Sequence, residues 1–188
     1  MRICGMKTEA RPAQKHRESG QSFPAIVAAM IGADNQFIAI HRTFLAPDGF
    51  GKAPVEPVRK IWPRFGGTGA AVHLWRGETG LPADKAAKQG LWDSLALTEG
   101  IEDGLSVAIG CPELRVWCVG ALGNMAAIRL PPCCGEAIVF ADNDWGKPEA
   151  QALLNKGLNA LAQQKNVPVK VARSSWGKDT NDALRTGL

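Results

Sequence analysis

The second half of the sequence contains three acidic clusters, and each follows a short apolar run directly or after a short loop. The clusters are residues 98–103 (TEGIED), 142–144 (DND) and 178–182 (KDTND). Short apolar runs of this kind predict β-strands, and the C-terminal ends of parallel strands lie at one edge of a sheet. Carboxylates that converge at such an edge would bind a divalent metal ion. The clusters therefore predict a metal site.

The second cluster contains a pair of candidate ligands. Asp142 and Asp144 are two positions apart, so their side chains point the same way in an extended segment. Two carboxylates this close repel each other and are stable together mainly when a cation lies between them. Hard oxygen ligands favour Mg²⁺ or Mn²⁺. A loop turn capped by two Asx side chains is the structural alternative.

The first cluster places Glu99 directly after an apolar strand, where a carboxylate without a partner is unfavourable. Gly100 allows a tight turn from strand to helix. Asp103 follows one helical turn after Glu99 and could face the same pocket. The helix dipole offers another explanation for Glu102 and Asp103 in a first helical turn, but it explains Glu99 poorly.

The third cluster has two interpretations. Asp179 either caps the final helix or supports a metal ion, and Lys178 either contacts a phosphate or is solvated. The sequence separation is 43 residues from Glu99 to Asp142 and 37 residues from Asp142 to Asp179. Each interval fits a strand–helix unit of a compact α/β domain, so the ordered set is more specific than any single cluster.

The elements before these clusters form a different region. Residues 1–20 are basic with few apolar anchors, which predicts a poorly ordered arm. Residues 21–80 predict a small β-rich subdomain, because a hairpin pattern at 25–30 and 37–45 is followed by a third apolar run at 70–75.

The remainder of the chain alternates between strands and helices. The glycine-rich polar stretch 76–90 predicts a boundary, and residues 91–188 predict an α/β domain with a parallel sheet flanked by helices. The predicted strands are 95–98, 114–119, 137–141 and 167–172, and the predicted helices are 101–109, 122–128, 148–164 and 180–184.

The acidic clusters and their surroundings resemble a known family. The stretches LALTEGIEDGLSVA, IVFADND and GKDTND resemble the Toprim domain that primases, topoisomerases and some nucleases share. The upstream stretches AIHRTFLAPDGFGKAPVEPVRKIW and GAAVHLW are similar to phage- and plasmid-type primases or primase-helicases. The resemblance covers the chain from about Phe23 to the C-terminus and implies a Toprim-like fold with a small β-rich subdomain in front of it.

The resemblance also implies roles for individual residues. Glu99 matches the Toprim glutamate that acts as general acid/base beside the metal, and Asp142 and Asp144 match the metal-binding Asp-x-Asp. Asp103 matches an additional primase acid, and Asp179 matches the first acid of the last Toprim motif. Asn181 stands where some members have a second Asp. The residues that would contact nucleic acid or nucleotide phosphates are Arg42, Lys52, Arg59, Lys60, Arg64 and Lys178.

The implied activity is nucleotidyl transfer with Mg²⁺ or Mn²⁺. The implied partners are single-stranded DNA or an RNA primer with its template, nucleoside triphosphates, and a helicase or zinc-ribbon protein. A Toprim nuclease and a non-catalytic nucleic-acid-binding module remain alternatives. We expect the chain to be a minimal or truncated primase or a subunit of a split system. The sequence has no tyrosine, so it does not supply the nucleophile of a topoisomerase.

Composition fits this interpretation. Residues 1–80 contain 11 Lys and Arg against 6 Asp and Glu, whereas residues 81–188 contain 11 against 12. A basic surface beside an acidic metal site would give this distribution, as would a surface imbalance without function. The five cysteines include no CxxC pair, which predicts reduced thiols in a cytoplasmic protein. The longest apolar stretch is too short to span a bilayer, so no membrane association is expected.

Overall fold

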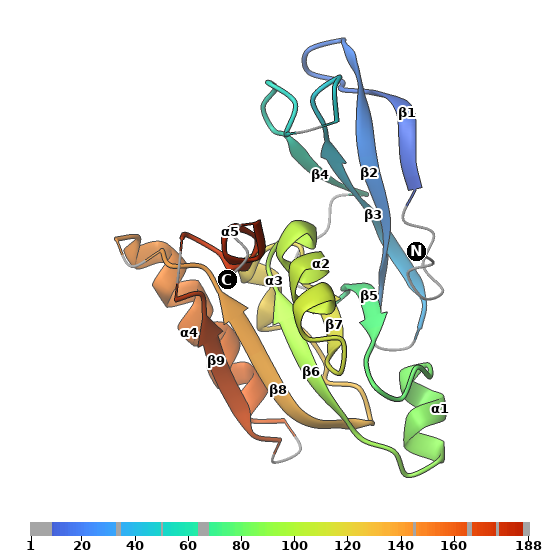
Figure 1. Ribbon diagram of the computed structural model, residues 1–188, viewed down its shortest axis with the longest axis vertical. Helices are drawn as coiled ribbons and strands as arrows, with labels where there is room; N and C mark the ends of the chain where they lie inside the picture. The colour runs from blue at the N-terminus through green and yellow to red at the C-terminus, as the bar shows by residue number, and fades with distance from the viewer. Residues whose placement is uncertain are drawn as a thin grey trace.

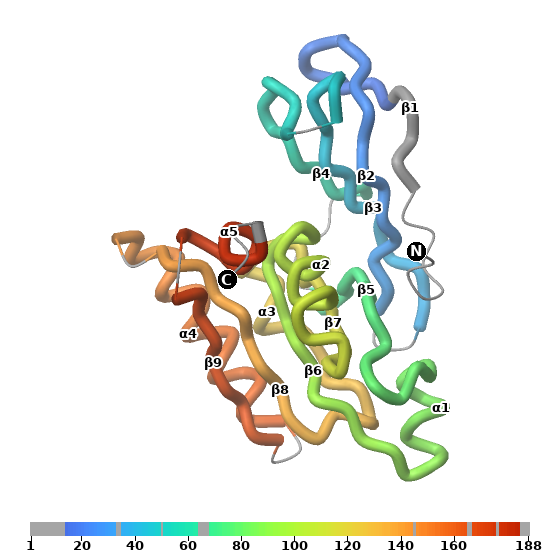
Figure 2. Tube along the Cα trace, viewed as in Figure 1, coloured from blue at the N-terminus to red at the C-terminus, as the bar shows by residue number. Residues whose placement is uncertain are grey.

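The computed structural model contains two β-sheets, one formed by the first third of the chain and the other by the remainder (Figures 1 and 2). The first sheet is antiparallel, with strand order β1-β2-β3-β4. Its strands are β1 (Glu9–Lys15), β2 (Ser22–Ile31), β3 (Phe37–Phe44) and β4 (Arg59–Trp62). The structure describes residues 9–32, 35–49, 51–63, 68–144, 146–164, 167–175 and 177–185.

The β2–β3 hairpin is confirmed, but β1 corrects the prediction of a poorly ordered arm over residues 1–20. Residues 9–15 form a strand that pairs with β2, while residues 1–8 lie outside the described part of the chain. The anchor is His16, which is 1% exposed and packs edge-on against Phe44 with the ring centroids 5.0 Å apart. A histidine among basic residues gives little hydrophobic signal, so the sequence pattern did not indicate this strand.

The second sheet has the strand order β5-β7-β6-β8-β9. The strands β6, β7, β8 and β9 are parallel, as predicted. The edge strand β5 is antiparallel to β7, so this sheet is mixed, and the run at 70–75 belongs here and not with the β2–β3 hairpin. The strands are β5 (Val72–Arg76), β6 (Asp93–Thr98), β7 (Arg115–Cys118), β8 (Cys134–Ala141) and β9 (Val169–Arg173).

Helices cover both faces of this sheet (Figure 1). α2 and α5 lie together on one face, whereas α3 and α4 lie together on the other. α1 forms within the stretch that was predicted only as a polar boundary. The helices are α1 (Ala83–Lys88), α2 (Ile101–Gly110), α3 (Leu122–Met125), α4 (Pro148–Ala162) and α5 (Thr180–Arg185).

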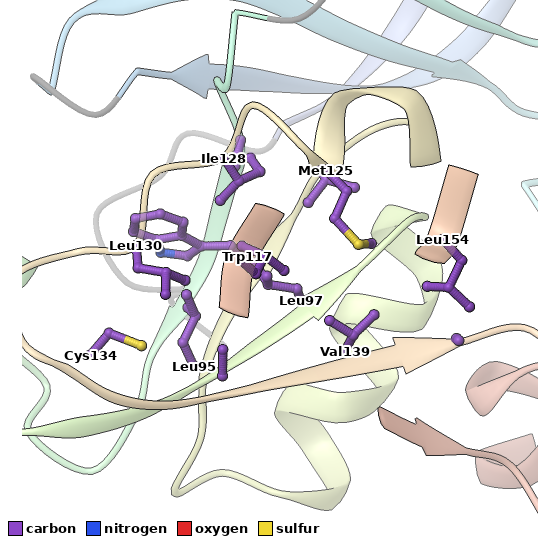
Figure 3. Close-up of a cluster of buried hydrophobic side chains, with 14 residues drawn as sticks. Leu95, Leu97, Trp117, Met125, Ile128, Leu130, Cys134, Val139 and Leu154 are labelled. Carbon is purple, nitrogen blue, oxygen red and sulfur yellow. The ribbon is translucent and has the colours of Figure 1, made fainter. Parts of the chain in front are cut away.

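The two faces of the sheet have separate hydrophobic cores. On the α3–α4 face, Leu97 and Val139 of the sheet pack with Met125 and Leu154 (Figure 3). On the α2 face, Met30 of the antiparallel sheet shares a core cluster with residues of the five-stranded sheet and of α2. Because one core spans both sheets, the antiparallel sheet is packed firmly beside the C-terminal half of the chain. Among the described helices, none is both long enough and apolar enough to cross a membrane.

Candidate active site

The first two acidic clusters lie side by side because they follow neighbouring parallel strands. Thr98 at the end of β6 is in register with Phe140 of β8. Glu99 comes directly after β6, and Asp142 comes directly after β8. The third cluster is joined to the second by a hydrogen bond in which the backbone amide of Asn143 donates to the carbonyl of Lys178 at 2.8 Å. All three clusters therefore meet at the C-terminal edge of the sheet.

Charge repulsion shows how closely the carboxylates are grouped. Burial raises the pKa of Glu99, and the negative charges of Asp142 and Asp144 raise it further. Burial also raises the pKa of Asp142, with further contributions from Asp179 and Asp144. Burial, followed by Asp179 and Asp142, raises the pKa of Asp103 to about 6. The pKa values of Glu99, Asp103 and Asp142 are thus raised partly by the negative charges of the other predicted metal ligands nearby.

The loop after β8 is held in place by Asn143, which the sequence interpretation did not include. Its side-chain amide donates to the carbonyls of Ser174 at 2.9 Å and Gly177 at 3.0 Å. The guanidinium of Arg173 donates to the carbonyl of Asp142. The middle residue of the DND cluster therefore fixes the loop, which leaves the two flanking aspartates to present their carboxylates. The signal in the sequence was an amide placed between two acids.

The capping alternative for Asp179 is confirmed. Its Oδ1 accepts a hydrogen bond from the backbone amide of Asp182 at 2.9 Å, at the start of α5. Asp103 accepts a hydrogen bond from the backbone amide of Asn181 at 3.3 Å, and Ser106 donates to the Asn181 side chain at 3.2 Å. α5 is therefore fastened to α2 by polar contacts. Capping does not remove Asp179 from the acidic edge, because its charge still acts on Asp103 and Asp142.

Two predicted basic residues from the first half of the chain reach this edge. Arg59 of β4 donates to both carboxylate oxygens of Glu102 at 3.2 Å, and the ammonium of Lys52 lies 3.8 Å from Glu102. Burial would raise the pKa of Glu102, but a backbone amide and these two cations together lower it. The charge of Arg59 also acts on Glu99 and Asp142. Glu102, attributed to the helix dipole in the sequence, is thus the ion-pair partner that positions both cations.

The other basic residues are distributed differently. Arg42 lies opposite Lys60 in the β3–β4 register, and Lys60 pairs with Glu18. The Arg42 guanidinium lies 5.9 Å from the centre of the Phe44 ring. Side chains alternate between the faces of a strand, so neither shares a face with Arg59. The ammonium of Lys178 lies 3.7 Å from Asp142, whereas Arg64 falls outside the described residues.

Two cavities flank the acidic edge. One has a volume of about 330 Å³ and lies between Lys52 and Arg59 on one side and Asp103 and Asp179 on the other. The second has a volume of about 760 Å³ and lies beside α3 and the start of α4. The residues that line the second cavity are Glu99, Ala121, Leu122, Gly123, Asp144, Gly146, Lys147, Pro148, Glu149, Ala150 and Leu153.

The described residues contain no group of three or more His, Cys, Asp or Glu side chains that are close enough together, as they lie, to hold a metal ion. Lysines pair with the two central carboxylates. Lys147 lies 2.9 Å from Asp144, and Lys178 lies near Asp142. Both ammonium groups are more than half exposed, and such exposed pairs are weak enough for another cation to replace them.

The mixed α/β sheet with acidic residues at the ends of its central strands defines the class of domain. Residues 94–188, half of the chain, match the family described as the Toprim domain, so this chain belongs to the Toprim family. Residues 6–74 match a family described as a domain of unknown function (DUF7146). No curated protein matches the chain.

The solved structures that resemble this chain include primases. The primase fragment of the bacteriophage T7 primase-helicase aligns with a TM-score of 0.55 at 18% identity, over 88% of this chain and 59% of that one. A DNA primase domain from Pseudomonas aeruginosa aligns with a TM-score of 0.54 at 12% identity, over 94% and 53%. The E. coli primase catalytic core aligns with a TM-score of 0.52 at 12% identity, over 94% and 54%. The chain thus spans little more than half the length of these primase chains, which share its fold.

Proposed function

We propose that this protein is a primase-type nucleotidyltransferase that joins a nucleoside triphosphate to the 3′ end of a primer on a single-stranded template. The observation that supports this most directly is that the acidic edge lies next to a basic surface of the antiparallel sheet. Glu99 and Asp142 lie at the acidic edge, and the charge of Arg59, which projects from the antiparallel sheet, acts on both. Phosphoryl transfer requires an activated hydroxyl and neutralised phosphate charge, and these surfaces supply a base and a cation. The primase folds that the chain resembles also support the proposal.

The residues fit a divalent metal ion. Burial, followed by repulsion from neighbouring carboxylates, raises the pKa of Glu99, Asp103 and Asp142, and a bound cation would relieve that repulsion. Glu99, Asp142 and Asp144 would hold Mg²⁺ or Mn²⁺, with Asp103 and Asp179 supporting them, because hard oxygen ligands favour these ions. When bound, the metal neutralises charge on the phosphates and on the leaving pyrophosphate.

The chain's own residues have separate tasks in this reaction. The primer 3′ oxygen attacks the α-phosphorus of the nucleotide, and a new phosphate ester bond forms. The bond from the α-phosphorus to the oxygen bridging to the β-phosphate breaks, and pyrophosphate leaves with that electron pair. Glu99 accepts the proton of the 3′ hydroxyl. Arg59 and Lys52 bind the triphosphate oxygens, to which charge-assisted hydrogen bonds are strong.

Further partners follow from the same proposal. Lys178 contacts phosphate at the acidic edge, whereas Arg42 and Lys60 contact the template or primer farther from it. Arg64, which lies outside the described residues, remains a proposed contact to nucleic acid. One of the primases that resemble this chain is part of a primase-helicase, and we propose that a helicase or zinc-ribbon protein works with this chain as well.

A primer-synthesis assay tests the proposed activity. The protein is incubated with single-stranded DNA, labelled nucleotides and Mg²⁺ or Mn²⁺, and labelled oligonucleotides are expected. Glu99→Gln removes the base and is expected to lower synthesis by at least about 100-fold. Glu113→Gln is the matched control, because Glu113 is exposed and lies outside both cavities. Cleavage of the template without incorporation would indicate a Toprim nuclease, and DNA binding without either reaction would indicate a non-catalytic module.

A further inference from the structure

The two cavities beside the acidic edge differ in their linings. Lys52 and Arg59 form one wall of the smaller cavity, and both project from the antiparallel sheet and its loop. The larger cavity contains one cation, Lys147, which is already paired with Asp144. Three carboxylates line each cavity, and the two cations of the smaller cavity share Glu102 as their ion-pair partner. The smaller cavity therefore has one more cation than the larger one, which favours a triphosphate there.

The larger cavity instead has the lining that an uncharged ring system needs. Leu122 of α3 and Leu153 of α4 face it together with the ring of Pro148. Leu153 is 41% exposed, although it is a large hydrophobic side chain. The volume of about 760 Å³ lies within the range of small-molecule sites, roughly 300–1,000 Å³. Apolar walls with a few polar groups at one end are typical of such sites.

Glu99 decides which reactant fits this cavity. It lines the larger cavity but not the smaller one. In the proposed reaction Glu99 takes the proton of the acceptor hydroxyl, so the acceptor must lie on the side that Glu99 faces. The charge of Asp142 acts on Glu99, which lines the larger cavity, and on Asp103, which lines the smaller one.

We propose that the larger cavity, which we call the α3–α4 cavity, binds the 3′-terminal nucleoside of the acceptor strand. The triphosphate of the incoming nucleotide binds in the smaller cavity, on the opposite side of the acidic edge. Leu122 and Leu153 contact the terminal base or sugar, and the 3′ hydroxyl points toward Glu99. This inference rests on the proposed nucleotidyl transfer and adds the direction in which the two reactants approach.

Filling the α3–α4 cavity tests the assignment. A Cβ at Gly123 would meet no atom within 4 Å, so Gly123→Leu adds a side chain to the cavity wall without a clash at Cβ. Gly110→Leu is the matched control, because Gly110 also has open space at its Cβ and lies at the opposite end of α2 from the acidic edge. Leu153→Ala is a second variant that removes an apolar contact, and thermal melts establish that each variant is folded.

Two probes separate the cavities in a binding experiment that needs no turnover. One is a fluorescent RNA dinucleotide with a free 3′ hydroxyl, and the other is a non-hydrolysable nucleoside triphosphate, each titrated in the presence of Mg²⁺. We expect Gly123→Leu and Leu153→Ala to weaken dinucleotide binding by about tenfold. Gly123→Leu occupies space that the nucleoside needs, and Leu153→Ala removes a partly buried leucine contact. Triphosphate binding should stay within about twofold of the wild type. Lys52→Ala should show the opposite pattern.

The outcomes distinguish the inference from the proposed function. If the wild type extends primers but Gly123→Leu weakens the triphosphate and not the dinucleotide, the cavity assignment is wrong and the activity stands. If the wild type binds neither probe and makes no product, both are wrong. Equal dinucleotide affinity of the wild type and Leu153→Ala would also overturn the assignment.

Discussion

The two sheets place charged residues by different rules. In the five-stranded sheet, β6 and β8 are parallel, so the residues that follow them, Glu99 and Asp142, arrive at the same edge. In the antiparallel sheet, neighbouring positions of β4 face opposite sides. Arg59 pairs with Glu102 at the acidic edge, whereas Lys60 pairs with Glu18 away from it.

This difference determines what a charge pattern can reveal. Position at a strand end is sufficient to predict where an acidic residue lies in a parallel sheet. For a cation within an antiparallel strand, successive side chains point to opposite faces, so a shift of one position moves the cation to the other face of the sheet. Arg42 and Arg59 therefore look equivalent as members of a basic half, yet only Arg59 has a charge that acts on Glu99.

Neutralising one arginine from each face would test this comparison and has the largest expected effect. Arg59→Gln should lower kcat/KM for nucleotide addition by about 100-fold, because it removes a positioned donor for phosphate charge. Arg42→Gln removes one proposed contact to the template or primer and should lower kcat/KM by about fivefold or less. Steady-state primer extension measures both, with the KM for the nucleotide determined separately.

Thermal unfolding controls for the ion pair that Arg59→Gln removes, since Glu102 keeps Lys52 as a partner. Equal losses in the two variants would show that the faces of the antiparallel sheet do not separate the roles of its cations. A loss that is larger in Arg42→Gln would reverse the assignment.

The same contrast explains how much was predictable. The strands and helices of the second half were indicated well, because continuous apolar runs alternate with helical periodicity there. β4 (Arg59–Trp62) was not predicted, because its four residues begin with two cations and gain their partner only when β3 is present. The sheet to which β5 belongs was also not predictable, because its strand partner β7 lies about 40 residues later in the chain.

Within the site, the residue types were more predictable than their partners. Glu99, Asp142 and Asp144 were identified from strand ends alone. The ion pair of Glu102 with Arg59 joins residues 43 positions apart, one in helix α2 and the other in strand β4, and a local pattern does not contain that information. The local sequence therefore explained Glu102 by the helix dipole. The tertiary contact shows that Glu102 is also the ion-pair partner of Arg59.

His41, a buried histidine of the antiparallel sheet, leads to a prediction about the pH dependence of stability, with an effect of intermediate size. Burial, followed by the nearby charge of Arg59, lowers the pKa of His41 from 6.5 to about 4. In the unfolded chain this histidine binds its proton near pH 6.5, whereas the folded protein does not bind it until about pH 4. Stability due to His41 is therefore present above pH 6.5 and is lost as the pH falls toward 4, by about 2 kcal/mol between pH 7 and pH 5.

Urea unfolding of the wild type and His41→Gln at these two pH values measures that loss. The raised pKa of Asp103 acts in the opposite direction over the same range, so the difference between the two proteins is the informative quantity. We expect the wild type to lose about 2 kcal/mol more than the variant. Equal losses of unfolding free energy in the wild type and His41→Gln would show that protonation of His41 does not destabilise the folded state.

The smallest expected effect concerns the five-stranded sheet, at the lysine that pairs with Asp144. Lys147 is exposed and lies 2.9 Å from that carboxylate, so its ammonium competes with a metal ion for the same oxygen. Lys147→Met should strengthen Mn²⁺ binding by about twofold to fivefold, because an exposed ion pair is weak and its loss leaves the Asp144 carboxylate free for the metal ion. Lys156→Met within α4, the helix that Lys147 immediately precedes, is the control, since Lys156 is exposed and lines neither cavity. Calorimetric titration with Mn²⁺ measures both, and weaker binding in Lys147→Met would show that the lysine supports the metal site and does not compete with it.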